Sequence, residues 1–536
     1  MNISNDVESG NPTRIKPRRR RFRIVATLCV ILVAGWFGLW VLSNTKIKLS
    51  VSQETTRETE PLRPDGWLDF PKIINRRMSE GVSNEENAAI DLWHALGPSP
   101  DGAPIEFHER LCAAWGTEPL PIAGDYFVTF QHFMRSTRQP GMPLPNSNEL
   151  KNDTDRAAQA PWRVEALPNL ARWLEANREP LEMVRRAVLK PKYFRPVVVA
   201  DDELLMDGLL PDVQTYRSIS DALCSRAMLR AANQDFEEAF EDIATTHHLA
   251  RHVSHGGFLI EFMVALSIQR KAFDCEAHLL TELLLSAEQA RHHRERLVAV
   301  AEVRHPADLL DFADRFMVLD SAQSILTERT NDTKQRDIFS RLLWRLVDWS
   351  PALVEIQSSI DQAVETLRTD DPSEFRRRRD EFEKTLSAER LRKLMGQVGT
   401  NDFVFRRREL AKRMGRGLAA EFMPAFQTIP DFVTGNQARA EMLRLSYALL
   451  EYRIQNGHFP EQVSRLVPDF LPKLPNDGFT GRPFIVTLTE NSFAIRSVGS
   501  DGELASEDTE SSDDLVIRFD TTSRSAAEQS QSEKDH

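Results

Sequence analysis

The sequence predicts a mostly helical protein with one N-terminal transmembrane helix, a body of helical hairpins, and a small C-terminal α+β domain with a short antiparallel sheet. Three observations predict this fold class. An uninterrupted apolar run occupies Ile24–Leu42, apolar residues recur at helical spacings through the middle of the chain, and short β-like runs follow near the C-terminus.

Length and charge bound what the chain can do. Its 536 residues are too many for one domain, and at roughly 100–200 residues per domain they predict about two to four. The 68 Lys and Arg residues stand against 80 Asp and Glu residues, which gives a formal net charge of −12. Nucleic-acid binding needs a concentrated positive surface, so this balance argues against nucleic acid as a partner.

The apolar run predicts a transmembrane helix over residues 23–43. Its nineteen apolar or small residues, at about 1.5 Å each, extend roughly 28 Å, close to the hydrocarbon thickness of a bilayer. Seven Lys or Arg residues lie between positions 14 and 23, whereas only Lys46 and Lys48 follow the run before the first acid. Residues 1–22 are therefore expected in the cytoplasm, and the rest of the chain outside it.

Three alternatives to an uncleaved anchor stay open. A cleaved signal peptide usually has a shorter apolar region and an Ala-x-Ala-like exit, but here the run continues into Leu42-Ser43-Asn44. The phrase RRRFRI loosely resembles a twin-arginine signal, although no clear cleavage site follows it. A buried core helix would leave the flanking arginines unexplained. The sequence favours the anchor.

Residues 44–64 are polar and predict a linker, and residues 65–430 predict a helical extracytoplasmic body. Pro and Gly clusters such as Gly97-Pro98-Ser99-Pro100 separate its helices. Helices are expected at Ser83–Leu96 with a cap at Ser83 or Asn84, and at Leu167–Val188, Ser218–Ala232, Phe236–His252, Phe258–Leu280, Glu288–Val300 and Asp308–Leu326. The turn Asn233-Gln234-Asp235 is expected to join the helices Ser218–Ala232 and Phe236–His252 as a helical hairpin.

The stretch Asp370–Arg416 is dense in charge and contains several runs of arginine. Phe375 and Phe382 lie at helical spacing, as expected for an amphipathic helix with a solvated face. The alternative is an anionic partner such as phospholipid headgroups. Acids such as Glu374 and Asp380 interleave with the arginines and favour the solvated face.

Residues 431–520 differ in composition from the body. A strong helix is expected at Gln437–Gln455, ended by Gly457-His458-Phe459-Pro460. Strands are expected at Phe484–Leu488, Phe493–Val498 and Leu515–Phe519, with the first two joined as a hairpin. Residues 521–536 are polar and are expected to be disordered.

This C-terminal order resembles the globular domain of the major pseudopilin of type II secretion systems. In that family a helix ends in a phrase like Tyr-Arg-x-x-x-Gly-x-Tyr-Pro, followed by Leu-Pro, Gly-x-Pro and a hairpin that closes on Ser-x-Gly-x-Asp-Gly. The matching text here is Tyr452-Arg453, Gly457-His458-Phe459-Pro460, Leu474-Pro475, Gly481-Arg482-Pro483, Ser497–Gly502 and the closing Asp513-Asp514-Leu515. The resemblance covers about 85 of the 536 residues and implies a pseudopilin-like α+β fold.

The resemblance also implies a calcium site in the loop before the last strand. Carried over residue by residue, Asp501 with Asp513 or Asp514 would supply carboxylates and Val498 a backbone carbonyl. A hard cation takes several oxygen ligands and would tie down a loop that otherwise repels itself. The loop is longer than in the family and carries further acids, so a solvated acidic loop is the alternative.

The chain departs from the family in two ways, so the resemblance applies only to the C-terminal fold. The segment before the apolar run lacks the family's leader, which has a Gly before the cleavage site and a Glu five residues after it, and roughly 390 residues separate anchor and C-terminal segment. The chain is therefore not expected to assemble into a pilus by that route. Phrases such as GVSNEENAAIDLWHALGP resemble large bacterial families of single-anchor proteins without assigned function, which implies the bacterial inner membrane.

The clustered histidines are the first candidates for metal chemistry. His248 and His252 lie at i and i+4 beside His247 and His255, as two metal ligands on one helix face would. No Glu follows in a His-Glu-x-x-His arrangement, which favours ordinary surface or half-buried histidines. Cysteines are expected as small buried hydrophobes, with a disulfide among the last three left open: Cys29, Cys112, Cys224 and Cys275.

No Gly-x-Ser-x-Gly, Walker-type or dinucleotide-binding glycine pattern occurs in the sequence, so no catalytic or cofactor-binding residue can be named. The expectation is a membrane-anchored extracytoplasmic structural or protein-interaction protein that binds other envelope proteins. The alternatives are an envelope hydrolase of unfamiliar type and an accessory component of a secretion system.

Overall fold

A computed structural model gives the fold. It describes residues 27, 35, 36, 47, 49–64, 66–137, 146–200, 203–208, 212–282, 285–300, 304–327, 344–345, 347–369, 371–386, 400–422, 428–504 and 513–520. In this part of the chain no helix has both the length and the hydropathy of a membrane span. All but three residues of the predicted anchor at 23–43 lie outside the described residues, as do the predicted disordered residues 521–536.

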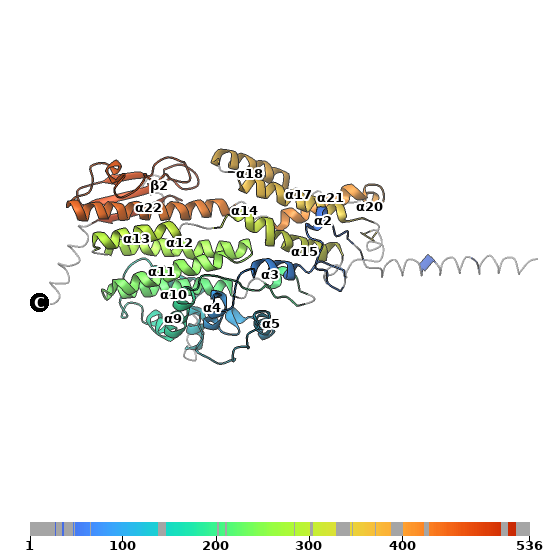
Figure 1. Ribbon diagram of the computed structural model, residues 1–536, viewed down its shortest axis with the longest axis horizontal. Coiled ribbons are helices and arrows are strands. Elements are labelled where there is room, and N and C mark those ends of the chain that lie inside the picture. Colours follow the sequence, from blue (N-terminus) through green and yellow to red (C-terminus); the bar gives the residue numbers. More distant parts are fainter. Residues whose placement is uncertain are drawn as a thin grey trace, which may run out of the picture.

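The described chain is mostly helical, as predicted, and its long helices lie side by side (Figure 1). The N-terminal half contains α2 Gln53–Thr56, α3 Phe70–Met78, α4 Ala88–Leu96, η1 Pro100–Gly102, α5 Ile105–Trp115, α6 Phe130–Ser136, α7 Ser147–Ala157, α8 Pro168–Ala176, α9 Arg178–Ala187, η2 Leu205–Gly208, α10 Val213–Ala232 and α11 Phe236–Ser254. The C-terminal half contains α12 Leu259–Glu282, α13 Ala287–Val300, α14 Pro306–Leu309, η3 Leu310–Asp314, α15 Arg315–Leu326, α17 Ser350–Leu367, α18 Pro372–Leu386, α20 Thr400–Phe405, α21 Arg407–Phe422, α22 Ile429–Asn456, η6 Val463–Leu466, β1 Ile485–Leu488, β2 Ser492–Ser497 and β3 Leu515–Asp520.

The predicted hairpin of α10 and α11 is confirmed and forms the centre of the body. Ala227 and Ala239 are fully buried at its interface, where small side chains let the two helices approach closely. The turn passes through Gln234 at φ +61°, and Asp242 accepts hydrogen bonds from Arg226 at 2.6 and 3.0 Å across the hairpin. The helix α12 then packs on both, so α10, α11 and α12 make one layer.

Several helix boundaries differ from the prediction: α10 begins at Val213 rather than Ser218, α22 begins at Ile429 rather than Gln437, and two further differences are due to a buried asparagine. The helix expected from Ser83 begins at Ala88, since Asn87 rather than Ser83 or Asn84 caps it by accepting from the Ala89 N–H at 3.1 Å. The single helix expected at 167–188 is two helices, α8 and α9. Asn177 lies between them and is held by Val128, whose N–H donates to the asparagine side chain at 2.8 Å. Both asparagines are fixed by long-range contacts, Asn87 through the Phe194 backbone and Asn177 through Val128, which leave no local signal.

The charge-dense stretch forms three helices in the described residues, α18, α20 and α21. Glu374 accepts hydrogen bonds from Arg377 and Arg378 at 2.7 Å each, and Phe382 is buried. The interleaved acids therefore neutralise part of the arginine run locally, and the apolar positions face the core. Cys112, Cys224 and Cys275 are buried free thiols, as the sequence predicted.

The C-terminal segment is a long helix, α22, packed against a three-stranded antiparallel sheet in the order β1-β2-β3. The strands lie within a residue or two of the prediction. Ile495 pairs with Val486 on one side and with Ile517 on the other, and the apolar face of the sheet buries Phe493 and Phe519 against α22. Because Phe273 of α12 and Leu297 of α13 belong to the same core, the segment is packed into the body.

A buried charge network also joins the body to α22. Glu276 of α12 accepts from the Tyr447 hydroxyl at 2.8 Å, from Arg296 at 2.9 Å and from His247 Nε2 at 3.2 Å. Burial works against ionisation, but Arg296 and His247 hold the pKa of Glu276 at about 2. This carboxylate is thus charged at neutral pH and ties together α11, α12, α13 and α22.

Candidate functional site

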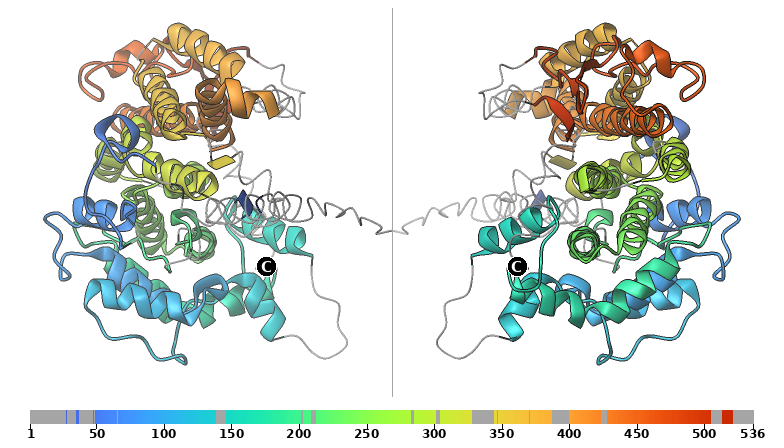
Figure 2. Two further views of the ribbon diagram at one scale, coloured as in Figure 1. Left: turned by 90° about the vertical axis from the view of Figure 1, so that its right-hand side faces the viewer. Right: turned by 90° about the vertical axis from the view of Figure 1, so that its left-hand side faces the viewer.

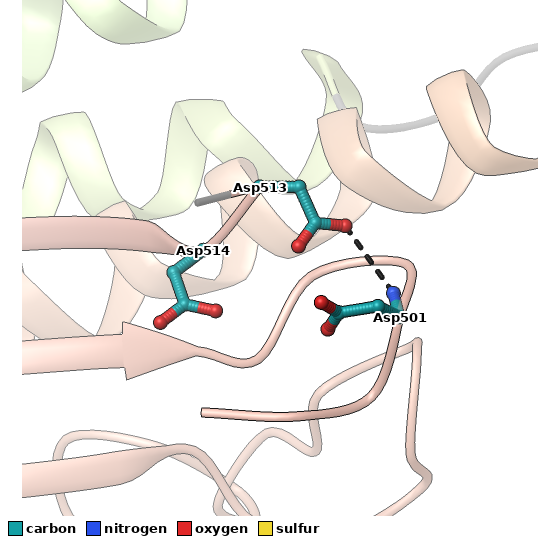
Figure 3. A group of neighbouring side chains, drawn as sticks. All are labelled: Asp501, Asp513 and Asp514. Atoms are coloured by element: carbon teal, nitrogen blue, oxygen red, sulfur yellow. Dashed lines mark hydrogen bonds between the residues drawn. The ribbon is translucent and has the colours of Figure 1, made fainter. Parts of the chain in front are cut away.

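Asp501, Asp513 and Asp514 come together at one end of the sheet (Figure 3). One oxygen from each carboxylate lies within 4.8 Å of the others. The antiparallel register explains the convergence: Ser497 and Leu515 form the last pair of β2 and β3, so the residues just after β2 meet those just before β3. These are the three carboxylates of the predicted calcium set.

Asp513 is the fixed member of the group. Its Oδ2 accepts from the backbone N–H and the hydroxyl of Ser500, both at 2.6 Å, and from the Asp501 N–H at 3.2 Å. These hydrogen bonds lower the pKa of Asp513. A side chain at Gly499 would place its Cβ 2.6 Å from the Asp513 carboxyl, and Gly499 has φ +66°. Only glycine suits that position.

Val498 lies next to this group, but its N–H donates at 3.2 Å to another carboxylate, Asp477. Asp477 is buried, accepts from the Phe479 N–H at 3.0 Å, and its own N–H donates to the Arg482 carbonyl at 2.7 Å. Sequence analysis missed Asp477. The signal was the turn Asn476-Asp477-Gly478, a residue combination that favours a side chain binding its own backbone.

A groove of about 1300 Å³ runs beside the acidic group, between the body and the C-terminal segment. Viewed along the long axis, the helices lie on an arc from the blue and teal N-terminal helices to the orange C-terminal ones (Figure 2). The groove is lined by residues of α7, α10, α12, α22 and β3, and Asp514 is one of them. One member of the predicted metal group, Asp514, thus lies at the rim of this groove.

Charged side chains in the groove are paired across its helices. Lys271 of α12 donates to Asp155 of α7 at 3.0 Å and to Asp221 of α10. Arg439 of α22 donates to Asp274 of α12 at 2.9 Å. Burial opposes the charge on Lys271, but the attraction of Asp221 outweighs it and raises the lysine pKa. These pairs cross-link the walls.

The strand β3 presents its outer edge to the groove. Five consecutive residues, Asp514 to Arg518, line it. A sheet face would contribute only alternate residues, because side chains of a strand alternate between faces. No further strand pairs with β3 beyond β2 in the described residues. The edge therefore brings backbone groups to the groove.

The histidine cluster does not form a metal site. His252 Nε2 donates to the Val188 carbonyl at 2.9 Å, while His247 faces Glu276, so the rings point to different partners. Burial lowers the pKa of His248 and of His252 to about 4, which makes both neutral at pH 7. His247 and His252 are buried, whereas surface or half-buried histidines were expected. Among the described residues, only the three aspartates form a group with metal-ligand spacing.

A second set of acids is fully enclosed near the start of α12. Arg195 pairs with Glu261 at 2.8 Å and with Asp212 at 3.2 Å. Asp314 accepts from the Leu259 N–H at 2.8 Å and ends the π-helical turn η3. Burial raises the pKa of Asp314 to about 8, and the nearby Glu261 adds to the effect. Glu261 and Asp314 accept from the Phe258 and Leu259 N–H groups and so cap the N-terminus of α12, where carboxylates are favoured.

Comparison with protein-family models, with curated proteins and with solved structures found no match to this chain. The pseudopilin resemblance therefore stays a prediction that rests on the C-terminal sequence phrases and on the order of helix and strands.

Proposed function

We propose that the chain is a membrane-anchored extracytoplasmic protein-interaction protein, and that its groove holds an extended segment of another envelope protein. The observation that supports this is the edge of β3, which lines the groove over four consecutive residues, Leu515 to Arg518, directly after Asp514. An exposed strand edge offers N–H and C=O groups to an incoming strand, a recurrent mode of peptide recognition.

The chemistry of the groove favours an extended polypeptide over a charged small molecule. Two of its cations, Lys271 and Arg439, are already neutralised by acids of neighbouring helices. An incoming backbone, uncharged and rich in hydrogen-bonding groups, needs no free charge to be recognised. Val516 is 41% exposed on β3 and offers an apolar contact for one side chain of the segment.

The interaction is tested by photo-crosslinking in intact cells. A photoreactive residue replaces Val516 in the full-length chain, and an adduct with one envelope protein is expected, cross-linked through an extended segment mapped by mass spectrometry. The matched control replaces Ile485 on β1, which is 42% exposed at the opposite edge of the sheet. Equal labelling from both positions, or none from Val516, would falsify the groove as the binding surface.

The location belongs to the same proposal. The arginine-rich flank and the apolar run at 23–43 support an inner-membrane anchor with the bulk outside the cytoplasm. Protease added to spheroplasts is expected to digest the chain beyond residue 44 while leaving cytoplasmic proteins intact. Protection of the full chain would place the body on the other side and end the proposal of an envelope partner.

We further propose that the three aspartates bind calcium, with the Val498 carbonyl as an additional oxygen ligand. Three carboxylates near one another repel, and a divalent cation removes that repulsion. Bound calcium would order the loop that leads into β3 and hold the groove rim. Sites of this exposed kind bind in the range of about 10⁻⁴–10⁻³ M.

Calcium binding is tested by thermal melting of the full chain in detergent. Adding 1 mM Ca²⁺ after chelation is expected to stabilise the fold by about 1 kcal/mol for a site in that range. Asp501→Asn and Asp514→Asn should abolish the gain, while Asp101→Asn, an exposed acid outside the loop, should keep it. An unchanged melting temperature at millimolar Ca²⁺ would leave only a solvated acidic loop.

A secretion-system accessory is the second candidate. It is favoured by the order of the C-terminal segment, a long helix α22 followed by an antiparallel three-stranded sheet. Under this candidate the cross-linked partner of Val516 would itself be a pseudopilin-like protein. A partner of another class would keep the interaction proposal and remove the secretion-system one.

A further inference from the structure

A second hollow, of about 680 Å³, lies on the body away from the groove. Its walls come from the end of α3, the end of α11, the segment after α9, and the helical turns that start at Pro306. None of its lining residues also lines the groove. This volume is in the range of small-molecule sites. We call it the basic pocket.

Three arginines from three separate elements enter the basic pocket. Arg77 lies at the end of α3, Arg251 in the last turn of α11, and Arg304 before α14. The Arg77 guanidinium stacks over the Phe312 ring at 4.5 Å. In the described part of the chain, no carboxylate lies within salt-bridge distance of any of the three.

The acids of the pocket are mostly committed to other cations. Asp308 pairs with Arg368 at 3.1 Å, and Asp311 pairs with Arg315 at 2.5 Å. Lys192 is paired with Glu86 at 2.8 Å. With Lys192 and Arg368 the pocket lining holds five cations against three acids, Glu80, Asp308 and Asp311, so positive charge is in excess there, in a protein whose net charge is −12. The helix dipole would explain one cation at the C-terminal end of α11. It does not explain three arginines that come from three different elements.

Electrostatics of the pocket agree with this geometry. Burial lowers the pKa of Arg304, and the neighbouring charge of Arg77 lowers it further against the attraction of Asp308. Burial likewise lowers the pKa of His255, and Arg304 and Arg251 add to the effect. Like charges held together in a hollow without a counter-ion raise the local affinity for an anion.

We propose that the basic pocket binds a phosphate group carried by a small organic molecule or a lipid headgroup. Guanidinium groups approaching from three sides suit a tetrahedral oxyanion with several acceptor oxygens, whereas a planar carboxylate is satisfied by one arginine fork. Part of the remaining wall is apolar or aromatic, with Met78, Val82, Tyr193 and Phe312, and can accommodate the organic part of the ligand. This site is independent of the proposed groove interaction.

The proposal is tested by calorimetric titration of the full chain in a zwitterionic detergent. One arm uses glycerol phosphate, and the other uses a soluble short-chain phosphatidylglycerol with the matching phosphatidylcholine as reference. Saturable binding of glycerol phosphate alone identifies a free phosphate ester, and binding of phosphatidylglycerol alone identifies a headgroup; either supports the proposal. Binding in neither arm, or equal binding of acetate, overturns it.

The arginines are tested by substitution. Arg304→Gln and Arg251→Gln are each expected to weaken binding about tenfold, as loss of a charge-assisted hydrogen bond does. Arg453→Gln is the control, because Arg453 lies in the C-terminal segment, where it stacks on Phe459 at 4.9 Å, and does not line the basic pocket. Two variants guard against one failing to fold. Unchanged affinity in both folded arginine variants would reject the assigned site.

Discussion

The groove and the basic pocket are both polar hollows, but they differ in how their charged side chains are paired. In the groove, Lys271 reaches Asp155 and Asp221, and Arg439 reaches Asp274, so these two cations are matched by acids of other helices. In the basic pocket, Arg251 and Arg304 have no such acid among the described residues. The first arrangement holds helices together, and the second leaves charge available to a ligand.

The difference matters because removing a paired cation and removing an unpaired cation have different effects on the free energy of unfolding. In a partly buried ion pair, the attraction between the two charges offsets the cost of their desolvation. Removing one member leaves the other charge poorly solvated and without its partner. An unpaired cation near like charges is already unfavourable, so removing it costs the fold little and harms only ligand binding. Stability and binding measurements should therefore separate the two hollows.

The largest stability effect is expected from Lys271→Met in the groove. Its side chain and that of Asp221 are only 22% and 27% exposed, so the substitution strands a poorly solvated carboxylate. A loss of about 2 kcal/mol in the free energy of unfolding is expected from urea denaturation, below the full cost at a completely buried pair.

The control for Lys271 is the adjacent residue. Arg270 pairs with Asp274 at 3.6 Å, but its side chain is 53% exposed, and Arg270→Gln is expected to change stability by no more than about 0.5 kcal/mol. Equal losses from both variants would mean that the groove pairs owe nothing to their burial, and the contrast with the basic pocket would weaken.

The second prediction concerns the enclosed acids near the basic pocket. Asp314 has a folded-state pKa raised to about 8, above the ordinary aspartate value of 3.8. Its contribution to stability is complete below about pH 4 and is lost as pH rises toward 8, because the unfolded chain ionises first. Asp314→Asn keeps an acceptor for the Leu259 N–H and cannot ionise.

Thermal or urea melts at pH 5 and pH 8 measure this directly. The natural chain should lose on the order of 1–3 kcal/mol more than Asp314→Asn between those two pH values. Asp308→Asn, an exposed acid paired with Arg368, should keep the natural pH dependence. If the natural chain and Asp314→Asn respond alike to pH, Asp314 is ionised in the fold throughout.

Helical periodicity and turn residues predicted much of the fold. The α10–α11 hairpin, α12 and the three strands follow from local patterns, because apolar spacing and Gly or Asn-rich turns act within a few residues. The breaks at Asn87 and Asn177 do not, since each asparagine binds backbone groups far away in sequence, Phe194 and Val128. Such contacts exist only once the chain has folded.

The sites divide in the same way. The convergence of Asp501, Asp513 and Asp514 could be expected, because a family phrase and an antiparallel register place them together. The basic pocket could not, since Arg77, Arg251 and Arg304 are spread over more than two hundred residues and none belongs to a conspicuous basic run. Whether an arginine is paired depends on tertiary neighbours that spacing does not encode.

The smallest stability effect is expected in the basic pocket itself. Arg304→Gln should change the free energy of unfolding by no more than about 0.5 kcal/mol in phosphate-free buffer, because it removes a like-charge contact with Arg77 along with a desolvated charge. A double-mutant cycle in urea with Arg77→Gln sharpens the result. The repulsion between the two arginines predicts that the double substitution gains less than the two single ones combined. A loss above 1 kcal/mol for Arg304→Gln would mean that this guanidinium stabilises the fold as Lys271 does, and the two hollows would then be alike.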